Sequence, residues 1–248
     1  FGTDGVRAED ADIDDAMTRS AVSRSEAFSE TNLRSETFYD ITQGKGEERA
    51  LLTYNYKNNG EDVRDTTKYN YETGSYELAR MTTSETFEGT VAFAEAASPT
   101  NTLKSTTYYY LDFDDPATPD VNEQEIEKGD EIADYTRDEK TGRDTYYFYA
   151  EEGSTFGTDG VRAEDADIDD AMTRSAVSRS AVFTEANLRS ETFYDITQGK
   201  GEERAALTYN YKNNGTTVRD TTKYNYETGS YETARMTTSE TFEGTVAF

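Results

Sequence analysis

Aspartates at alternate positions near the start of the chain are the first residues whose types and spacing could do chemistry. Asp10, Asp12 and Asp14 follow the D-x-D-x-D pattern that opens calcium-binding loops, in which carboxylate oxygens are ligands. The loop lacks the usual glycine at its sixth position and the usual Glu at its twelfth. We therefore interpret the stretch as a solvated acidic loop that is also a candidate site for weakly bound Ca²⁺. The same pattern recurs later in the chain at Asp165, Asp167 and Asp169.

Two residue types on which much enzyme chemistry depends, His and Cys, are missing from this 248-residue sequence. There is no His, the commonest general base, and no Cys, so neither a thiolate metal site nor a disulfide can form. The 51 acidic residues would allow a carboxylate pair of the kind that hydrolyses glycosides, but no spacing singles out a pair. The run Phe1–Arg7 resembles a motif of phosphohexomutases, yet none of that family's phosphoserine or metal-binding partners accompanies it. We predict that the protein is not an enzyme and uses no cofactor.

Charge and composition exclude two classes of partner. With a net charge of −26, the chain lacks the basic surface that binding to nucleic acid or an anionic membrane requires. No apolar run approaches the roughly 20 residues that span a bilayer, so we predict no membrane insertion. The 19 tyrosines offset a low aliphatic content, because each buries a large ring while keeping a polar tip. We expect an ordered fold with a thin core.

The stretch 49–87 predicts three long antiparallel strands. Tyrosines two apart, such as Tyr54 and Tyr56, place their rings on one face of a strand, and Thr and Tyr are strand formers. Glycine-containing turn sequences at 58–60 and 72–74 separate the three runs. We predict an all-β fold, an extended antiparallel meander or β-solenoid-like repeat sheet. The side chains expected in its core are Leu52, Tyr54, Tyr56, Tyr69, Tyr71, Met81 and Phe87.

Residues 1–93 recur almost unchanged at 156–248, and we name them copy one and copy two of a β-repeat with a period of 155 residues. Eight positions differ between the copies, and among them Leu51 and Leu78 become Ala and Thr in copy two. Because loss of a buried Leu costs roughly 2–5 kcal/mol, we place both leucines on the more polar face of the sheet. The near-identity predicts a longer tandem array, with a simple duplicated two-domain protein as the alternative.

A distinct segment, residues 94–155, separates the copies and contains all three prolines. We name it the insert. Its runs 104–113 and 143–149 repeat the Thr- and Tyr-rich strand pattern. The acidic run 114–130 contains two of the prolines and is expected to be an exposed loop.

Near the N-terminus the pattern allows one short helix, around residues 11–20. Ile13, Met17 and Ala21 lie at helical spacing, and acids precede them where a helix N-terminus favours negative charge. An Arg-Ser-Glu motif that recurs from Arg24 onward favours the sheet pattern instead, so any helix is expected to be short.

The motif Tyr54-x-Tyr56-x-x-x-Gly60, followed by Arg64, resembles the YD (tyrosine–aspartate, Rhs-type) repeats of large secreted and cell-surface proteins. Residues 138–147 are a second partial match. In this sequence Lys or Glu stands where those repeats carry their characteristic Asp. The resemblance implies long β-hairpins that form a repeat sheet exposed on a cell surface.

These features together predict a structural role. We predict a segment of an extracellular or cell-surface filament that is built from tandem β repeats and associates with itself through strand edges, where N–H and C=O groups are unpaired. The alternative is a cell-surface adhesin or glycan-binding stalk whose Tyr-rich faces, such as Tyr108–Tyr110, bind surface glycans.

Overall fold

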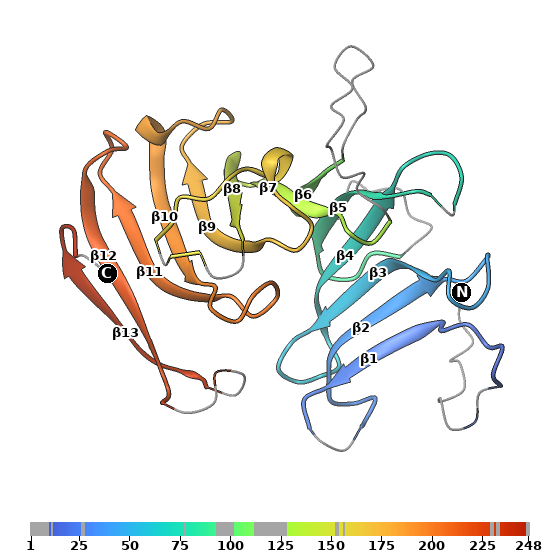
Figure 1. Ribbon diagram of the computed structural model, residues 1–248. Coiled ribbons are helices and arrows are strands. Elements are labelled where there is room, and N and C mark those ends of the chain that lie inside the picture. The colour runs from blue at the N-terminus through green and yellow to red at the C-terminus, as the bar shows by residue number, and fades with distance from the viewer. Residues whose placement is uncertain are drawn as a thin grey trace, which may run out of the picture. The chain divides into compact units, whose positions relative to one another are not determined.

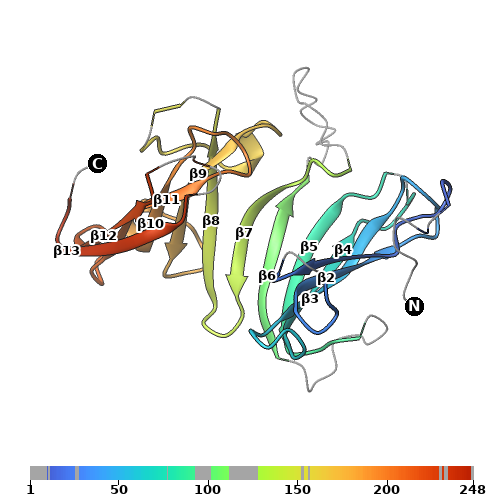
Figure 2. The same ribbon diagram turned by 90° about the horizontal axis from the view of Figure 1, so that it is seen from below.

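The computed structural model is all-β, as the sequence predicts (Figures 1 and 2). In the described part of the chain, thirteen strands form one open sheet, and their order in the sheet is their order in the sequence. The predicted antiparallel meander is therefore confirmed. The structure describes residues 10, 12–25, 28–76, 78–92, 102–111, 128–151, 154–155, 157–228, 231 and 234–246.

The strands follow the sequence divisions closely. Copy one supplies β1 (Arg19–Ser23), β2 (Leu33–Asp40), β3 (Arg49–Tyr56), β4 (Val63–Tyr71) and β5 (Met81–Glu88). The insert supplies β6 (Leu103–Tyr110), β7 (Ile132–Asp138) and β8 (Arg143–Ala150). Copy two supplies β9 (Ala171–Ser178), β10 (Leu188–Asp195), β11 (Arg204–Tyr211), β12 (Val218–Tyr226) and β13 (Met236–Glu243), with the short turns η1 (Ala163–Asp165) and η2 (Glu185–Asn187).

The chain is divided into two compact units, and the boundary between them lies in the insert, within β6. Unit 1 comprises Phe1–Thr106 and Glu127–Gly129, and unit 2 comprises Thr107–Ile126 and Asp130–Phe248. Copy one therefore lies in unit 1, and copy two lies in unit 2 together with β7 and β8.

The insert contains the two strands expected from its sequence and one more. The runs 104–113 and 143–149 correspond to β6 and β8, and β7 lies between them in the sheet. β7 was missed because its seven residues hold only one aromatic side chain, Tyr135. The acidic run expected to be a loop lies outside the described residues up to position 127.

A ladder of threonines crosses the strands predicted in the stretch 49–87. Thr53 on β3 lies opposite Thr37 on β2 and Thr67 on β4, and Thr67 lies opposite Thr86 on β5. The hydroxyls of Thr37 and Thr53 share a hydrogen bond of 2.7 Å, and those of Thr67 and Thr86 share one of 3.3 Å. Cross-strand pairs of this kind stabilise a sheet without apolar burial. The matching pairs in copy two are Thr192 with Thr208 and Thr222 with Thr241.

The residues predicted for the core are buried to different degrees. Leu52 and Phe87 are buried, while Met81 is half-buried. The predicted tyrosines are also half-buried: Tyr54, Tyr56, Tyr69 and Tyr71. Their hydroxyls find protein partners, since Tyr71 donates to the carbonyl of Ala50 (2.8 Å) and Tyr54 to that of Val91 (3.3 Å). The rings therefore cover the sheet while their polar tips are satisfied.

Leu51 corrects the placement of the polar face. Its side chain is 6% exposed, and its neighbours Leu52 and Thr53 are buried as well. Because successive side chains point to opposite faces, both faces of β3 are covered at its middle. The prediction that Leu51 lies on an exposed face is therefore wrong, whereas Leu78 is exposed, as predicted, in the loop before β5.

The helix expected around residues 11–20 is absent from the described residues 12–20, so that prediction is also wrong. The N–H of Asp12 donates to the carboxylate of Asp15 (2.8 Å), and the N–H of Asp15 donates to the carbonyl of Asp12 (3.0 Å). Asp side chains compete in this way with the backbone bonds of a helix. The result is a tight turn, after which β1 starts at Arg19. Nowhere in the described ranges is there a helix long and apolar enough to cross a membrane.

Gly60, in the turn between β3 and β4, tests how tightly this hairpin packs. Its φ is +74°, and an added Cβ would lie 2.6 Å from the Cα of Asn32 and 2.8 Å from the carbonyl oxygen of Thr31. Gly44 has a similar φ of +90° but nothing within 4 Å of such a Cβ. We predict that Gly60→Ala lowers the free energy of unfolding by about 2–4 kcal/mol and Gly44→Ala by only about 1 kcal/mol. Urea denaturation followed by circular dichroism measures both, and equal losses would contradict the prediction.

Candidate functional site

The six aspartates proposed as calcium ligands do not converge in the structure. Within the described ranges, no group of three or more acidic side chains is placed to hold a metal ion. All six side chains are exposed: Asp10, Asp12, Asp14, Asp165, Asp167 and Asp169.

A lysine ammonium lies at the turn that these aspartates form. Lys45 donates to the carbonyl of Ile13, and Lys200 donates to the carbonyl of Ile168 in copy two. The turn in copy two is closed by Asp170, whose carboxylate accepts a hydrogen bond from the N–H of Asp167 (3.0 Å). The two copies therefore use the acidic motif for the same local backbone bonds, and weak Ca²⁺ binding there stays a prediction.

The tyrosines of unit 2 pack on one another across neighbouring strands. Tyr108 on β6 stacks on Tyr135 on β7 with ring centroids 4.6 Å apart, and Tyr135 lies 5.5 Å from Tyr146 on β8. Phe183 extends the row at 5.2 Å from Tyr146. Such rows are cross-strand packing pairs, each worth roughly 0.2–1 kcal/mol.

The two open strand edges are the features of the molecule that resemble a binding site most closely. β5 and β13 have the same eight residues but different neighbours. β6 lies beside β5, where the N–H of Glu88 donates to the carbonyl of Thr102 (2.9 Å), and no described strand lies beyond β13. Phe87 on β5 is consequently 2% exposed, while its equivalent on β13, Phe242, is 39% exposed. The same eight residues are therefore more buried in β5, where a strand of the insert lies beside them, than in β13, where no described strand does.

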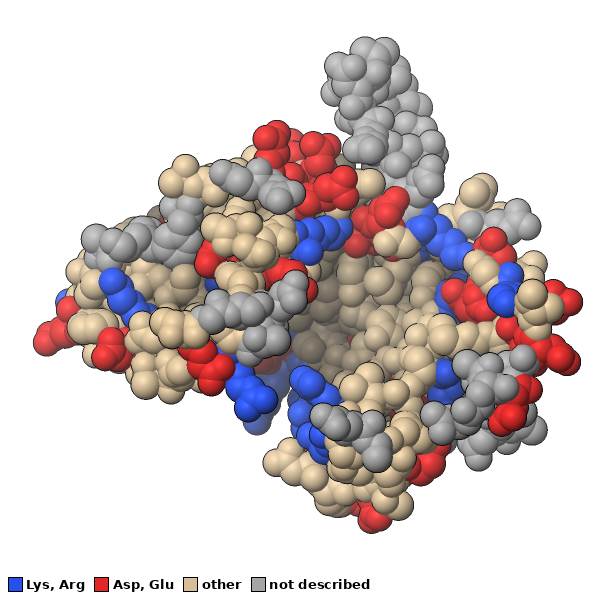
Figure 3. Space-filling model, turned by 60° about the horizontal axis from the view of Figure 1, so that its bottom comes forward, with Lys and Arg blue, Asp and Glu red and all other residues tan. Residues whose placement is uncertain are grey.

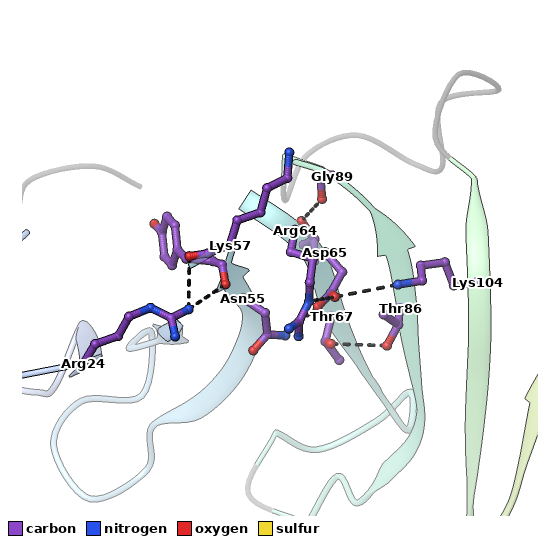
Figure 4. Close-up of polar contacts among 11 residues, drawn as sticks. Arg24, Asn55, Lys57, Arg64, Asp65, Thr67, Thr86, Gly89 and Lys104 are labelled. Atoms are coloured by element: carbon purple, nitrogen blue, oxygen red, sulfur yellow. Dashed lines mark hydrogen bonds and ion pairs between the residues drawn. The ribbon is translucent and has the colours of Figure 1, made fainter. Parts of the chain in front are cut away.

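A groove of about 400 Å³ lies where the start of β12 meets the end of β13, next to this open edge, and we name it the β13 groove. It is lined by Lys212, Val218–Asp220 and Thr241–Gly244. At the equivalent place in copy one, Lys104 extends from β6 so that its ammonium lies 3.7 Å from the carboxylate of Asp65, beside Thr86 (Figure 4). The groove in copy two therefore corresponds to a position that a side chain of the insert occupies in copy one.

The other open edge shows the same dependence on the insert. β8 pairs with β9 from Thr145 to Ala150, and β9 is eight residues long. Its equivalent in copy one, β1, has no described strand on its outer side and is only five residues long. The side chain of Arg174 on β9 is 4% exposed, compared with 21% for Arg19 on β1.

Arg174 is the centre of a buried ion-pair network. Its guanidinium pairs with Glu185 (2.9 Å) and Glu191 (3.1 Å), and lies 4.0 Å from the ring centroid of Phe148 on β8. Burial acts to lower the pKa of Arg174, but its hydrogen bond to Glu185 and the nearby carboxylates outweigh burial, so the pKa lies above its usual value. The carboxylates therefore keep the guanidinium of Arg174 protonated, and Phe148 of the insert covers it.

Sequence reasoning missed the role of the insert, although the signal was present. Copy one is followed by the insert and copy two is preceded by it, so each copy contacts the insert through a different edge. The sequence order alone implies that the last strand of copy two lacks the insert strand that follows copy one. It also implies that the first strand of copy one lacks the insert strand that precedes copy two.

The chain matches no known protein-family model, and a comparison with curated proteins gives no match either. The resemblance to YD repeats is therefore carried by the motif residues alone.

The duplicated arginines allow a matched test of what the insert contributes. Arg174→Met leaves Glu191 buried without its ion pair, and we expect it to lower the free energy of unfolding by about 3–5 kcal/mol. Arg19→Met removes the equivalent pair with Glu36, whose side chain is as buried as that of Glu191, but Arg19 itself is 21% exposed, so water reaches the vacated position and we expect a smaller loss. Urea denaturation of the two variants measures the difference. Equal losses would show that the covering strand adds nothing to the network.

Buried tyrosines are expected to make the fold sensitive to alkali. Burial raises the pKa of Tyr149, and burial with the hydrogen bond to Glu191 raises the pKa of Tyr211. In the unfolded chain both would ionise near pH 10. The native state therefore holds protons that the unfolded state releases, and the stability that this provides is present below about pH 10 and lost as the pH rises further.

We predict that the free energy of unfolding falls steeply between about pH 10 and pH 11. Tyr149→Phe removes one such proton and should reduce the slope by up to about 1.4 kcal/mol per pH unit. Urea midpoints measured from about pH 8 to pH 11 give both slopes, with the mildly alkaline values as the baseline. A slope that is the same in Tyr149→Phe and in the unaltered chain would contradict the assignment.

Proposed function

We propose that the chain is a structural segment of an extracellular or cell-surface filament that is built from tandem β repeats and associates with itself through strand edges. The observation that carries the proposal is the meander itself, since copy one, the insert and copy two add their strands to one sheet in sequence order. In an array of this period each further repeat would lengthen the sheet by the same set of strands.

In a chain made of complete 155-residue periods, each a copy followed by an insert, the last strand of one chain would match the first strand of the next. The last strand of the insert, β8, pairs with β9, the first strand of copy two. β1, the first strand of copy one, has the same residues as the corresponding part of β9 and no described strand on its outer side. A chain that ends in a β8-type strand could therefore join the β1 edge of the next chain. Head-to-tail contacts of this kind produce filaments unless the rotation closes a ring.

The surface charge is compatible with long assemblies that stay apart. The net charge is −26, and Figure 3 shows Asp and Glu side chains spread over one face with Lys and Arg among them. Repulsion between acidic filaments opposes lateral clumping, while contacts along the filament axis depend on backbone pairing.

The packing of the tyrosines supports a structural role over the adhesin alternative. The rings of Tyr108 and Tyr135 stack on each other. One face of each ring is therefore covered and is not available for stacking on a sugar. The proposal includes no catalysis and no cofactor.

Filament formation can be tested with a chain of two whole periods, made by adding a second copy of residues 94–155 after Phe248. We name it the two-period chain. Negative-stain electron microscopy at increasing protein concentration should show filaments that lengthen, because its β8-type end matches its β1 edge. The 248-residue chain is the control and should stay in short particles, since neither of its end strands, β1 and β13, is of the β8 type. Discrete particles of the two-period chain at every concentration would overturn the proposal.

A further inference from the structure

We infer that the edge of β13, together with the β13 groove, is a docking site for a strand with the sequence of β6, contributed by a second copy of the insert that follows β13. The inference rests on the proposed function and names the element that would cover one of the two open edges. It is carried by the comparison between copy one, where this strand is present, and copy two, where the same surface is uncovered.

The surface itself is unchanged between the copies. None of the eight differences between them falls on the residues that line the β13 groove or on β13. The contact that β6 makes in copy one is therefore available in copy two with the same side chains. A docked strand would cover Phe242, as Phe87 is covered in copy one.

Charge complementarity favours a β6-type strand as the occupant. Asp220 lies in the β13 groove, and its carboxylate accepts hydrogen bonds from Arg219 (2.5 Å) and Asn210 (2.7 Å). Its equivalent, Asp65, has the same two partners, and the ammonium of Lys104 from β6 is added at 3.7 Å. A strand with Lys at this position would bring a positive charge to a carboxylate that is already held in place.

The residues that follow β13 make the same hydrogen bonds as the residues that follow β5. The hydroxyl of Thr221 donates to the carbonyl of Gly244 (2.6 Å) and accepts from the N–H of Val246 (3.2 Å). Tyr209 donates to the carbonyl of Val246 (3.0 Å). Thr66 and Tyr54 make the same three bonds in copy one, where the chain goes on to form β6. The backbone therefore leaves both copies in one conformation, which in copy one precedes the covering strand.

Backbone geometry identifies the groups that the docked strand would use. The N–H of Glu88 donates to the carbonyl of Thr102, the residue just before β6, and the N–H of Gly89 donates to the carbonyl of Arg64 on β4. Because N–H groups alternate in direction along a strand, those of Ser239, Thr241 and Glu243 point to the open edge of β13. Each unpaired donor at this edge would gain an acceptor on docking.

Hydrogen exchange of β13 in the two-period chain tests the inference. Peptides from the two copies can be separated by mass, because Leu78 in one is Thr233 in the other. We expect exchange in the β13 peptide to slow at least about tenfold relative to the 248-residue chain, and to approach that of β5. An unchanged rate in β13 would overturn the inference.

A matched pair of charge changes in the added insert tests the docking contact without altering β13. Replacing the added Lys104 by Glu places a negative charge beside Asp220 and should reverse a large part of the protection. Lys140→Glu in the added insert changes the charge equally but lies at an exposed turn and should leave protection intact. Equal loss of protection in both variants, or in neither, would contradict the contact.

The two proposals fail in different ways. Protection of β13 without filaments would contradict the proposed function and support the docking site. Filaments without protection of β13 would support the function and overturn the docking site, because pairing with any strand would slow exchange in β13.

Discussion

Backbone pairing between neighbouring strands is the interaction on which the rest of this structure depends. The apolar clusters are small, and one of them consists of Tyr146, Phe148, Ala176 and Leu188. Several of the most deeply buried side chains are threonines, including Thr66 and Thr221, and their hydroxyls bond to backbone groups. With little apolar area to bury, each strand relies on the ladder bonds and cross-strand side-chain pairs that a neighbour supplies.

This dependence explains why identical sequences differ in their surroundings. Every residue of β5 is repeated in β13, yet β5 is largely covered while all of β13 is exposed. β1 is likewise shorter than β9, although the residues are the same. The local sequence determines each strand and its partner on one side, and the insert determines how much of the outer side is paired and buried.

Much of the fold could be predicted from sequence because the alternation of Tyr and Thr is local. The strands of the stretch 49–87 follow directly from that alternation and from two glycine turns. The placement of Leu51 could not be predicted, because it depends on side chains that cover both faces of β3. The acids at Asp12–Asp15 favour both a helix start and a tight turn, and the hydrogen bond from the N–H of Asp12 to the carboxylate of Asp15 decides for the turn.

The two open edges could not be identified from local sequence patterns, because an edge depends on the order of strands in the sheet. The sequence contains both copies and the insert, but only the pairing order shows that β6 covers one kind of edge and β8 the other. The aspartates at positions 10, 12 and 14 carried the stronger motif and yet do not come together. Motif spacing describes neighbours along the chain, whereas a strand edge is a property of which element comes next in the sheet.

An exposed edge would pair with many strands, so a repeat protein needs something that selects the right one. A register irregularity would provide part of this selection at the β9-type edge, because β8 shifts against β9 at Phe148/Tyr149. Such bulges bend the strand and fix which residues face each other, so a strand without the matching irregularity loses part of the ladder. The Lys–Asp contact beside β5 adds a charge requirement at one edge, and the cover of Phe148 over Arg174 adds an aromatic one at the other. Because the two requirements differ, each edge would favour its own end of the insert, and in the proposed array the order of strands would follow from the order in the sequence.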